Sequence, residues 1–278
     1  MYESSFDKIR KAYRKICEST ELDALKNRLD GITPIQTLRS FIDMTKNEKV
    51  NALIESGAVL KCIGASSRIA LLTNDGTVLK IANNEKGLAQ NKAEAYNAAE
   101  KNRYGCFAKV LWVSRTKFAL EMELANKLDG SDLEFEEITG VNIDDYFDYL
   151  QYERFSTMTP KKRDVVYRAY FSKERDSNNL SSKMEWLRES HAKVAEYLMS
   201  QSTSNVAATV LKNLAQYIRT HNSTADFSFR DLASSNNWGK VERDGQEVCV
   251  VLDHGASEWV LNHMYHGLDT TGLQGYVK

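Results

Sequence analysis

The chain lacks a cysteine pattern, an apolar run of membrane-spanning length and an excess of charge of either sign. Its four cysteines have no Cys-x-x-Cys spacing, so we expect buried or incidental thiols in a reducing compartment instead of a disulfide framework. No apolar run is long enough to cross a bilayer, and the first residues do not form a charged and then apolar signal region. We therefore expect a cytoplasmic protein without a membrane partner.

Charge and length narrow the class further. The 37 Lys and Arg residues nearly balance the 38 Asp and Glu residues, and the formal net charge of -1 gives no bulk attraction to nucleic acid. With 278 residues, of which 42% are hydrophobic and 27% charged, the chain can bury an ordinary core and is not intrinsically disordered. It has neither an internal repeat nor a low-complexity tract. These properties predict a globular protein without a nucleic-acid partner.

Three polar residues near the C-terminal end have the types and spacing that magnesium-dependent phosphoryl transfer needs. Asp231 stands in an Arg-Asp-Leu sequence, Asn236 follows five residues later, and Asp253 stands two residues before a glycine. A carboxylate such as that of Asp231 can orient an attacking hydroxyl and accept its proton. Magnesium prefers hard oxygen ligands, which Asn236 and Asp253 provide. Common loop residues also produce such a match by chance, so support has to come from elsewhere in the chain.

Turn signals predict two hairpins. The sequence Asn-Asp-Gly joins two apolar, β-prone runs at residues 60–72 and 77–82, which is the pattern of a β-hairpin. The dipeptide Asp-Gly predicts a second hairpin around residues 240–246. This second hairpin would return Asp253 to a position beside Asn236.

Lys80 lies in the middle of the expected strand 77–82, between leucine and isoleucine. A buried lysine is costly unless its ammonium is paired, so we expect an anionic partner. Glu94, in the middle of a helix-like run at residues 88–99, is the natural partner. The alternative is an edge-strand lysine that faces water, together with a solvated glutamate.

The order of these motifs resembles that of the protein-kinase-like superfamily, especially its small, divergent phage and bacterial members. The order runs from the hairpin through the Val-Leu-Lys-Ile-Ala strand, the helix with Glu94 and the segment 118–125 to the Arg-Asp-Leu loop and Asp-His-Gly. The resemblance implies an α+β, two-lobed fold with ATP and Mg²⁺ between the lobes. The implied domains are a helical N-terminal extension (1–57), an N-lobe with a small antiparallel sheet (58–125), and a mainly helical C-lobe (126–278), shortened at its C-terminus and carrying an insertion at about 130–204.

The resemblance also implies a role for each matching residue. Lys80 would hold the α and β phosphates of ATP, Glu94 would orient Lys80, and Asp231 would be the catalytic base. Further nucleotide contacts would come from a phosphate-covering turn, from a gatekeeper residue and from the backbone of the hinge. These contacts fall on Gly64, Ser66, Ser67 and Arg68 for the turn, on Met122 for the gatekeeper, and on Glu123 and Ala125 for the hinge.

The implied Mg²⁺ ligands are Asn236 and Asp253. Asn237 lies next to Asn236 and stays open as an alternative, although the family's ordinary spacing favours Asn236. Only residues 254–278 follow Asp253, which is too short for the family's activation segment and its peptide-binding helices. We therefore expect the insertion to rebuild the substrate side of the C-lobe or to dock a protein partner.

The chain departs from the family pattern at several positions. Ala65, Ser66 and Ser67 replace glycines that would allow close backbone approach to phosphate. Phe229 stands where the family has histidine before Arg-Asp, and His254 stands where it has phenylalanine after the metal-binding aspartate. None of these changes removes a metal ligand or the base.

Apolar spacing at residues 6–17 and a capping pattern from Thr33 predict two helices in the N-terminal extension. We expect these helices to pack on the N-lobe, with a regulatory or dimerising role as the alternative.

The expected function is that of an ATP- and Mg²⁺-dependent Ser/Thr protein kinase, acting on cellular proteins or on those of a host. Three alternatives stay open. A small-molecule kinase of the aminoglycoside or choline type would use the same residues, adenylyl transfer would require inverted ATP, and a pseudokinase or protein-binding module would bind ATP without turnover. The residue pattern fits each of these activities, and it leaves the oligomeric state open.

Overall fold

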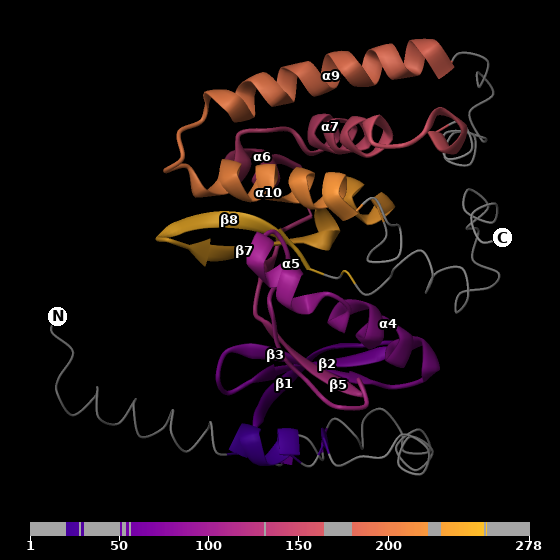
Figure 1. Ribbon diagram of the computed structural model, residues 1–278. Helices are drawn as coiled ribbons and strands as arrows, with labels where there is room; N and C mark the ends of the chain where they lie inside the picture. The colour runs from indigo at the N-terminus through magenta and orange to yellow at the C-terminus, as the bar shows by residue number, and fades with distance from the viewer. Residues whose placement is uncertain are drawn as a thin grey trace, which may run out of the picture. The chain divides into compact units, whose positions relative to one another are not determined.

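The chain folds as an α+β protein with a five-stranded antiparallel sheet and helices, and it divides into two compact units (Figure 1). Unit 1 comprises residues 1–96 and 109–124, and unit 2 comprises residues 97–108 and 125–278. The α+β class and the small antiparallel sheet expected from the sequence are confirmed. The computed structural model describes residues 21–27, 29–30, 51, 54–55, 57–130, 132–163, 180–221, 229–252 and 254.

Unit 1 is built on the five-stranded sheet, whose order is β1-β2-β3-β5-β4. Each neighbouring pair of strands is antiparallel. Strands β2 and β3 form the expected hairpin, and Gly76 in its turn has φ 75°, a conformation that favours glycine. The strands span Val59–Ala65 (β1), Arg68–Thr73 (β2), Thr77–Ala82 (β3), Val110–Val113 (β4) and Ala119–Glu123 (β5).

The two faces of this sheet are covered by different helices (Figure 1). Alternation along β3 places Leu79 on one face and Lys80 on the other. The Lys80 face meets α4 (Glu85–Ala95). The Leu79 face packs against the N-terminal helical segment, residues 21–27 and 29–30, through Leu22, Leu25 and Leu29.

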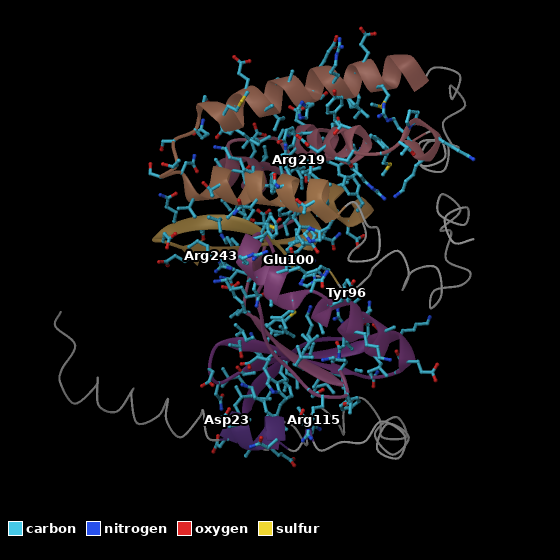
Figure 2. The ribbon with its side chains drawn as sticks, viewed as in Figure 1. Asp23, Tyr96, Glu100, Arg115, Arg219 and Arg243 are labelled. Carbon is cyan, nitrogen blue, oxygen red and sulfur yellow. The ribbon has the colours of Figure 1, made fainter. Side chains whose placement is uncertain are left out.

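Two ion pairs attach the N-terminal helical segment to its unit. Lys26 Nζ lies 2.6 Å from Glu121 Oε2 on β5. Arg115, labelled in Figure 2, places its Nε 2.7 Å from Asp30 Oδ2. The helices that the sequence predicts at 6–17 and after residue 33 lie outside the described residues.

Unit 2 stacks helices on a three-stranded antiparallel sheet of order β6-β7-β8. Helix α7 packs on both α9 and α10, and α10 covers β8 (Figure 1). The insertion expected at about 130–204 includes α6, α7 and the described part of α9. The elements span Ala98–Tyr104 (α5), Asn126–Lys127 (β6), Asp132–Thr139 (α6), Ile143–Ser156 (α7), Leu180–Ser200 (α9), Val206–His221 (α10), Phe229–Ala233 (η1), Ser235–Asn237 (η2), Trp238–Arg243 (β7) and Gln246–Val251 (β8).

The aromatic residues of α7 form packing contacts. Tyr146 is fully buried, and the ring of Tyr149 stacks on His191 of α9 with centroids 4.7 Å apart. Burial raises the pKa of Tyr149 to about 12. Glu153 is shared between His191 Nε2 at 2.8 Å and Arg219 Nε at 3.2 Å. These tyrosines are therefore packing residues of unit 2.

The helical run predicted at residues 88–99 is interrupted. Helix α4 ends at Ala95, and α5 begins at Ala98. Between them Asn97 has φ 54°, a left-handed conformation that asparagine tolerates better than most residues and that ends a right-handed helix. The same break is where the chain leaves unit 1.

No helix within the described ranges combines the length and the apolar character that crossing a membrane requires.

Candidate functional site

Lys80 and Glu94 form a buried ion pair in unit 1. Lys80 Nζ lies 2.8 Å from Glu94 Oε1, and the two side chains are 13% and 0% exposed. Strand alternation points Lys80 towards α4, and the last turn of that helix supplies Glu94. The expected pairing is confirmed, and the alternative of a solvated edge-strand lysine is excluded.

Arg68 is a second cation on the same carboxylate. Its Nη1 lies 2.8 Å from Glu94 Oε2, and the arginine side chain is 7% exposed. Two cations and one carboxylate give this cluster, Arg68, Lys80 and Glu94, a net charge of +1. The sequence interpretation assigned Arg68 to nucleotide phosphates and missed its contact with Glu94. The strand pattern contained a signal, since Arg68 and Lys80 share one face of the β2-β3 hairpin.

The turn expected to cover phosphates is hydrogen-bonded to α4 and to Asn83, which lies just before that helix. Ser67 Oγ donates a hydrogen bond of 2.5 Å to Gln90 Oε1. The carbonyl oxygens of Ser66 and Ser67 accept hydrogen bonds from Asn83, at 3.0 Å from the side chain and 2.9 Å from the backbone. Gly64 lies further back, within β1 opposite Ala70. The phosphate contacts of this turn stay a prediction.

The residues assigned to adenine contacts lie at and after the end of β5. Met122 is buried in the strand, and Glu123 is its last residue. The Glu123 N–H donates to the carbonyl of Lys109 over 2.8 Å, and its carboxylate accepts from the Lys109 N–H over 3.2 Å. The N–H of Glu123 is therefore already bonded within unit 1, and the adenine contacts stay a prediction. Ala125 follows as the first residue of unit 2.

In unit 2, the loop with Asp231 is anchored on α7. Its first residue, Phe229, is buried, with its ring centroid 5.3 Å from that of Phe147 and 4.7 Å from Cζ of Arg154. Asp231 is half-buried, and its backbone carbonyl accepts a hydrogen bond of 2.9 Å from Asn237 Nδ2. Phe229 thus supports the loop by ring packing where the kinase-like pattern has histidine.

Trp238 fixes the other end of this loop. Its side chain is fully buried, and its indole N–H donates to the carbonyl of Leu232 over 3.1 Å. Trp238 therefore anchors the loop, and its indole hydrogen has an acceptor.

The two neighbouring asparagines have different surroundings. Asn237 uses its amide to bind the Asp231 carbonyl, as described above. Asn236 is exposed, and within the described part of the chain its side chain has no hydrogen-bond partner. Its oxygen faces Gly130, where an added Cβ would lie 3.8 Å away. The Asn237 bond uses its amide nitrogen and not its oxygen, so the side-chain oxygens of both residues stay candidate ligands.

The hairpin of β7 and β8 has the predicted form and direction. Asp244 and Gly245 both have positive φ, 50° and 75°, as a two-residue hairpin turn requires. After β8, the N–H of Leu252 donates to the carbonyl of Asn237 over 2.9 Å, so the chain does return to the asparagine pair. Asp253 itself lies outside the described residues. Among those residues, no group of three or more His, Cys, Asp or Glu side chains could hold a metal ion.

A segment before α6 borders the same loop. Ser235 Oγ donates to the carbonyl of Gly130 over 3.2 Å. Glu134 accepts the N–H of Asp129 over 2.6 Å and lies 2.8 Å from Lys240 Nζ. The hydrogen bond from Lys240 holds the pKa of the Glu134 carboxyl below its usual range. These contacts fix the segment beside Asn236.

A buried pair that the sequence did not predict joins α5 to the end of the described chain. Lys101 is fully buried, and its Nζ lies 3.3 Å from Nδ1 of His254. The His254 ring also packs against Phe107, with centroids 5.1 Å apart. Because Lys101 and His254 are 153 residues apart, no local pattern could have indicated the contact.

No protein-family model, no curated protein and no solved structure matches this chain. What the protein does must therefore be inferred from two groups of residues, each within its own unit. In unit 1 the group is Arg68, Lys80 and Glu94, and in unit 2 it is the anchored loop with Asp231 and Asn236.

Proposed function

We propose that this protein is an ATP- and Mg²⁺-dependent phosphotransferase that uses a hydroxyl group as acceptor. The observation that carries the proposal is the buried pair of Lys80 and Glu94, with Arg68 on the second carboxylate oxygen. Apolar residues of similar volume would often stabilise the fold as well as a buried ion pair or better. A buried ion pair kept at such a site is therefore better explained by a role in binding a ligand than by stability, and a lysine suits an anionic ligand.

The residues of unit 1 suit the binding of a polyphosphate. Lys80 has the least buried side chain of the cluster, so its ammonium is the group that a phosphate would reach most easily. Lysine acts as a point charge with three donors, which suits phosphate oxygens. Lys80 would therefore bind the ATP phosphates, and Glu94 would hold Lys80 in place.

The residues of unit 2 suit the transfer step. The oxygen of the acceptor hydroxyl attacks the γ-phosphorus, the hydroxyl proton moves to the carboxylate of Asp231, and the bond from the γ-phosphorus to the bridging oxygen of ADP breaks. The anchors at Phe229 and Trp238 would keep Asp231 in one orientation, so that little ordering is left for the moment of reaction.

Mg²⁺ fits the donor types of the same loop. The exposed amide oxygen of Asn236 is a hard ligand, as is the carboxylate of Asp253. The ion, when bound, would neutralise charge on the phosphate oxygens. Asn236 and Asp253 are thus the residues that would hold it. Asn237 stays the alternative to Asn236, because its hydrogen bond to the loop uses the amide nitrogen and not the oxygen.

The first acceptor to test is serine or threonine in a protein. The purified chain would be incubated with Mg²⁺, a cell lysate and ATP labelled at the γ-phosphate. Label on protein bands supports a protein kinase, whereas label only on small molecules supports the aminoglycoside or choline type of reaction. Transfer of label from α-labelled ATP would indicate adenylyl transfer instead.

A matched pair of variants makes this assay specific. Asp231→Asn removes the proposed base, and Asp244→Asn makes the same change in the β7-β8 turn, where asparagine tolerates the positive φ. The proposal requires the loss of transfer in Asp231→Asn and its retention in Asp244→Asn. Nucleotide binding without any transfer by the unmodified chain would contradict the proposal and support a pseudokinase.

A further inference from the structure

One face of α4 meets the sheet through polar groups instead of an apolar stripe. Gly87, Gln90 and Glu94 are buried and follow the spacing of a single helix face. A Cβ at Gly87 would lie 2.0 Å from the carbonyl oxygen of Ser67, so the helix and the β1-β2 turn approach each other as closely as their backbones allow. Ser67 also binds Gln90. This face of α4 therefore packs against the β1-β2 turn and not against an apolar surface.

At Glu94, on the same face of α4, each carboxylate oxygen lies beside a different cation. Oε1 faces Lys80 on β3, and Oε2 faces Arg68 at the start of β2. If an anionic ligand draws Lys80 away, Arg68 still neutralises the carboxylate. A buried carboxylate left without any cation would be strongly disfavoured.

We propose that Arg68 is a positioning residue that holds Glu94 and α4 in place while Lys80 engages the phosphates of a nucleotide. This inference rests on the proposed function and assigns Arg68 an action through Glu94 instead of direct contact with the nucleotide. Both ion pairs form within unit 1 of the chain by itself.

The turn between β1 and β2 also helps to hold α4 in place. Asn83 donates to the carbonyls of Ser66 and Ser67, and Ser67 donates to Gln90. These hydrogen bonds link the turn to α4. Arg68 follows the turn directly, as the first residue of β2. Removing its guanidinium would therefore loosen α4 and leave Lys80 as the single cation on Glu94.

The first measurement needs no ligand. Amide hydrogen exchange of α4 would be compared between the unmodified chain, Arg68→Met and Arg68→Lys. Arg103→Met is the control, because the Arg103 side chain is 76% exposed and its contact with Glu100 is long, at 3.5 Å. We expect faster exchange across α4 in Arg68→Met, partial recovery in Arg68→Lys and no change in the control. Unchanged exchange in a folded Arg68→Met protein overturns the inference, whether or not the chain binds nucleotides.

The second measurement separates action through Glu94 from direct contact with phosphate. ATP affinity would be measured for Arg68→Met in the unmodified chain and in a Glu94→Gln background. We expect a loss of at least about 5-fold in the first and no loss in the second, because the coupling passes through the carboxylate. Equal losses in both backgrounds, or no loss in either, overturn the inference.

Failure of the proposed function gives a different result. If the unmodified chain does not bind ATP at all, the phosphotransferase proposal and the nucleotide part of this inference are both wrong. The exchange measurement then still decides whether Arg68 holds α4.

Discussion

The replacement Glu94→Gln tests how the buried cluster is held together. In the structure one fully buried carboxylate serves two cations, each at 2.8 Å. The amide of glutamine has the same shape but no charge, so Arg68 and Lys80 would face each other without an anion. Breaking a buried pair by removing one partner costs about 3–5 kcal/mol, and we expect a loss of this size for Glu94→Gln.

Removing a single cation should cost less. Arg68→Met and Lys80→Met each leave Glu94 with one cation. Lys80→Met removes a hydrogen bond to a charged group, so we expect a loss of about 1.5–3 kcal/mol. Arg68→Met removes an ion pair whose two atoms form no hydrogen bond, so its cost should be no larger. The double variant leaves the carboxylate without either cation. Its cost should therefore exceed the sum of the two single costs, by about 0.5–3 kcal/mol.

Native-state amide exchange of β2, β3 and α4 is the appropriate assay, because it reports opening free energies for unit 1 separately from unit 2. Arg115→Met, at the exposed pair with Asp30 in the same unit, gives the scale of an exposed pair, which is about 0–1 kcal/mol. If Glu94→Gln costs no more than this control, the cluster does not hold α4 to the sheet. Additive costs for the double variant would show that the two cations do not share Glu94.

Three further predictions concern single positions. Gly87→Ala would force a methyl group against the Ser67 carbonyl, so thermal unfolding should show a loss of about 1–3 kcal/mol; an unchanged melting temperature would contradict the close approach. Trp238→Phe would leave a buried loop carbonyl without its donor, at a cost of about 1–3 kcal/mol, which denaturant unfolding would detect or refute. Burial raises the pKa of Cys249 to about 12, so its thiol stays protonated at pH 8 and iodoacetamide should spare it in the folded protein, while the partly exposed Cys62 reacts. Mass spectrometry of the alkylated protein checks this order, and modification of Cys249 before Cys62 would contradict it.

The features that could be predicted from the sequence depend on neighbouring residues. Asn-Asp-Gly and Asp-Gly encode turns by their own backbone preferences, so both hairpins were found. Lys80 and Glu94 are 14 residues apart, and an aliphatic strand around a lysine already demands an anion. Trp238 likewise needed an acceptor once it was buried.

The features that were missed depend on contacts or conformations that carry little local signal. The left-handed Asn97 that separates α4 from α5 belongs to a residue type that also occurs within helices. An arginine such as Arg68 can pair with a phosphate or with a carboxylate, and its pairing with Glu94 follows only from the packing of α4 on the sheet. The contact of Lys101 with His254 joins distant parts of unit 2 and requires the folded chain.

The transfer rate of Asp231→Asn is the most direct test of the proposed function. Rates with γ-labelled ATP would be measured at saturating nucleotide, with nucleotide affinity determined separately and Asp244→Asn as control. We predict a decrease of about 10²- to 10⁴-fold for Asp231→Asn, the usual contribution of a general base, with affinity unchanged. Equal transfer rates in Asp231→Asn and in the unmodified chain would contradict the account.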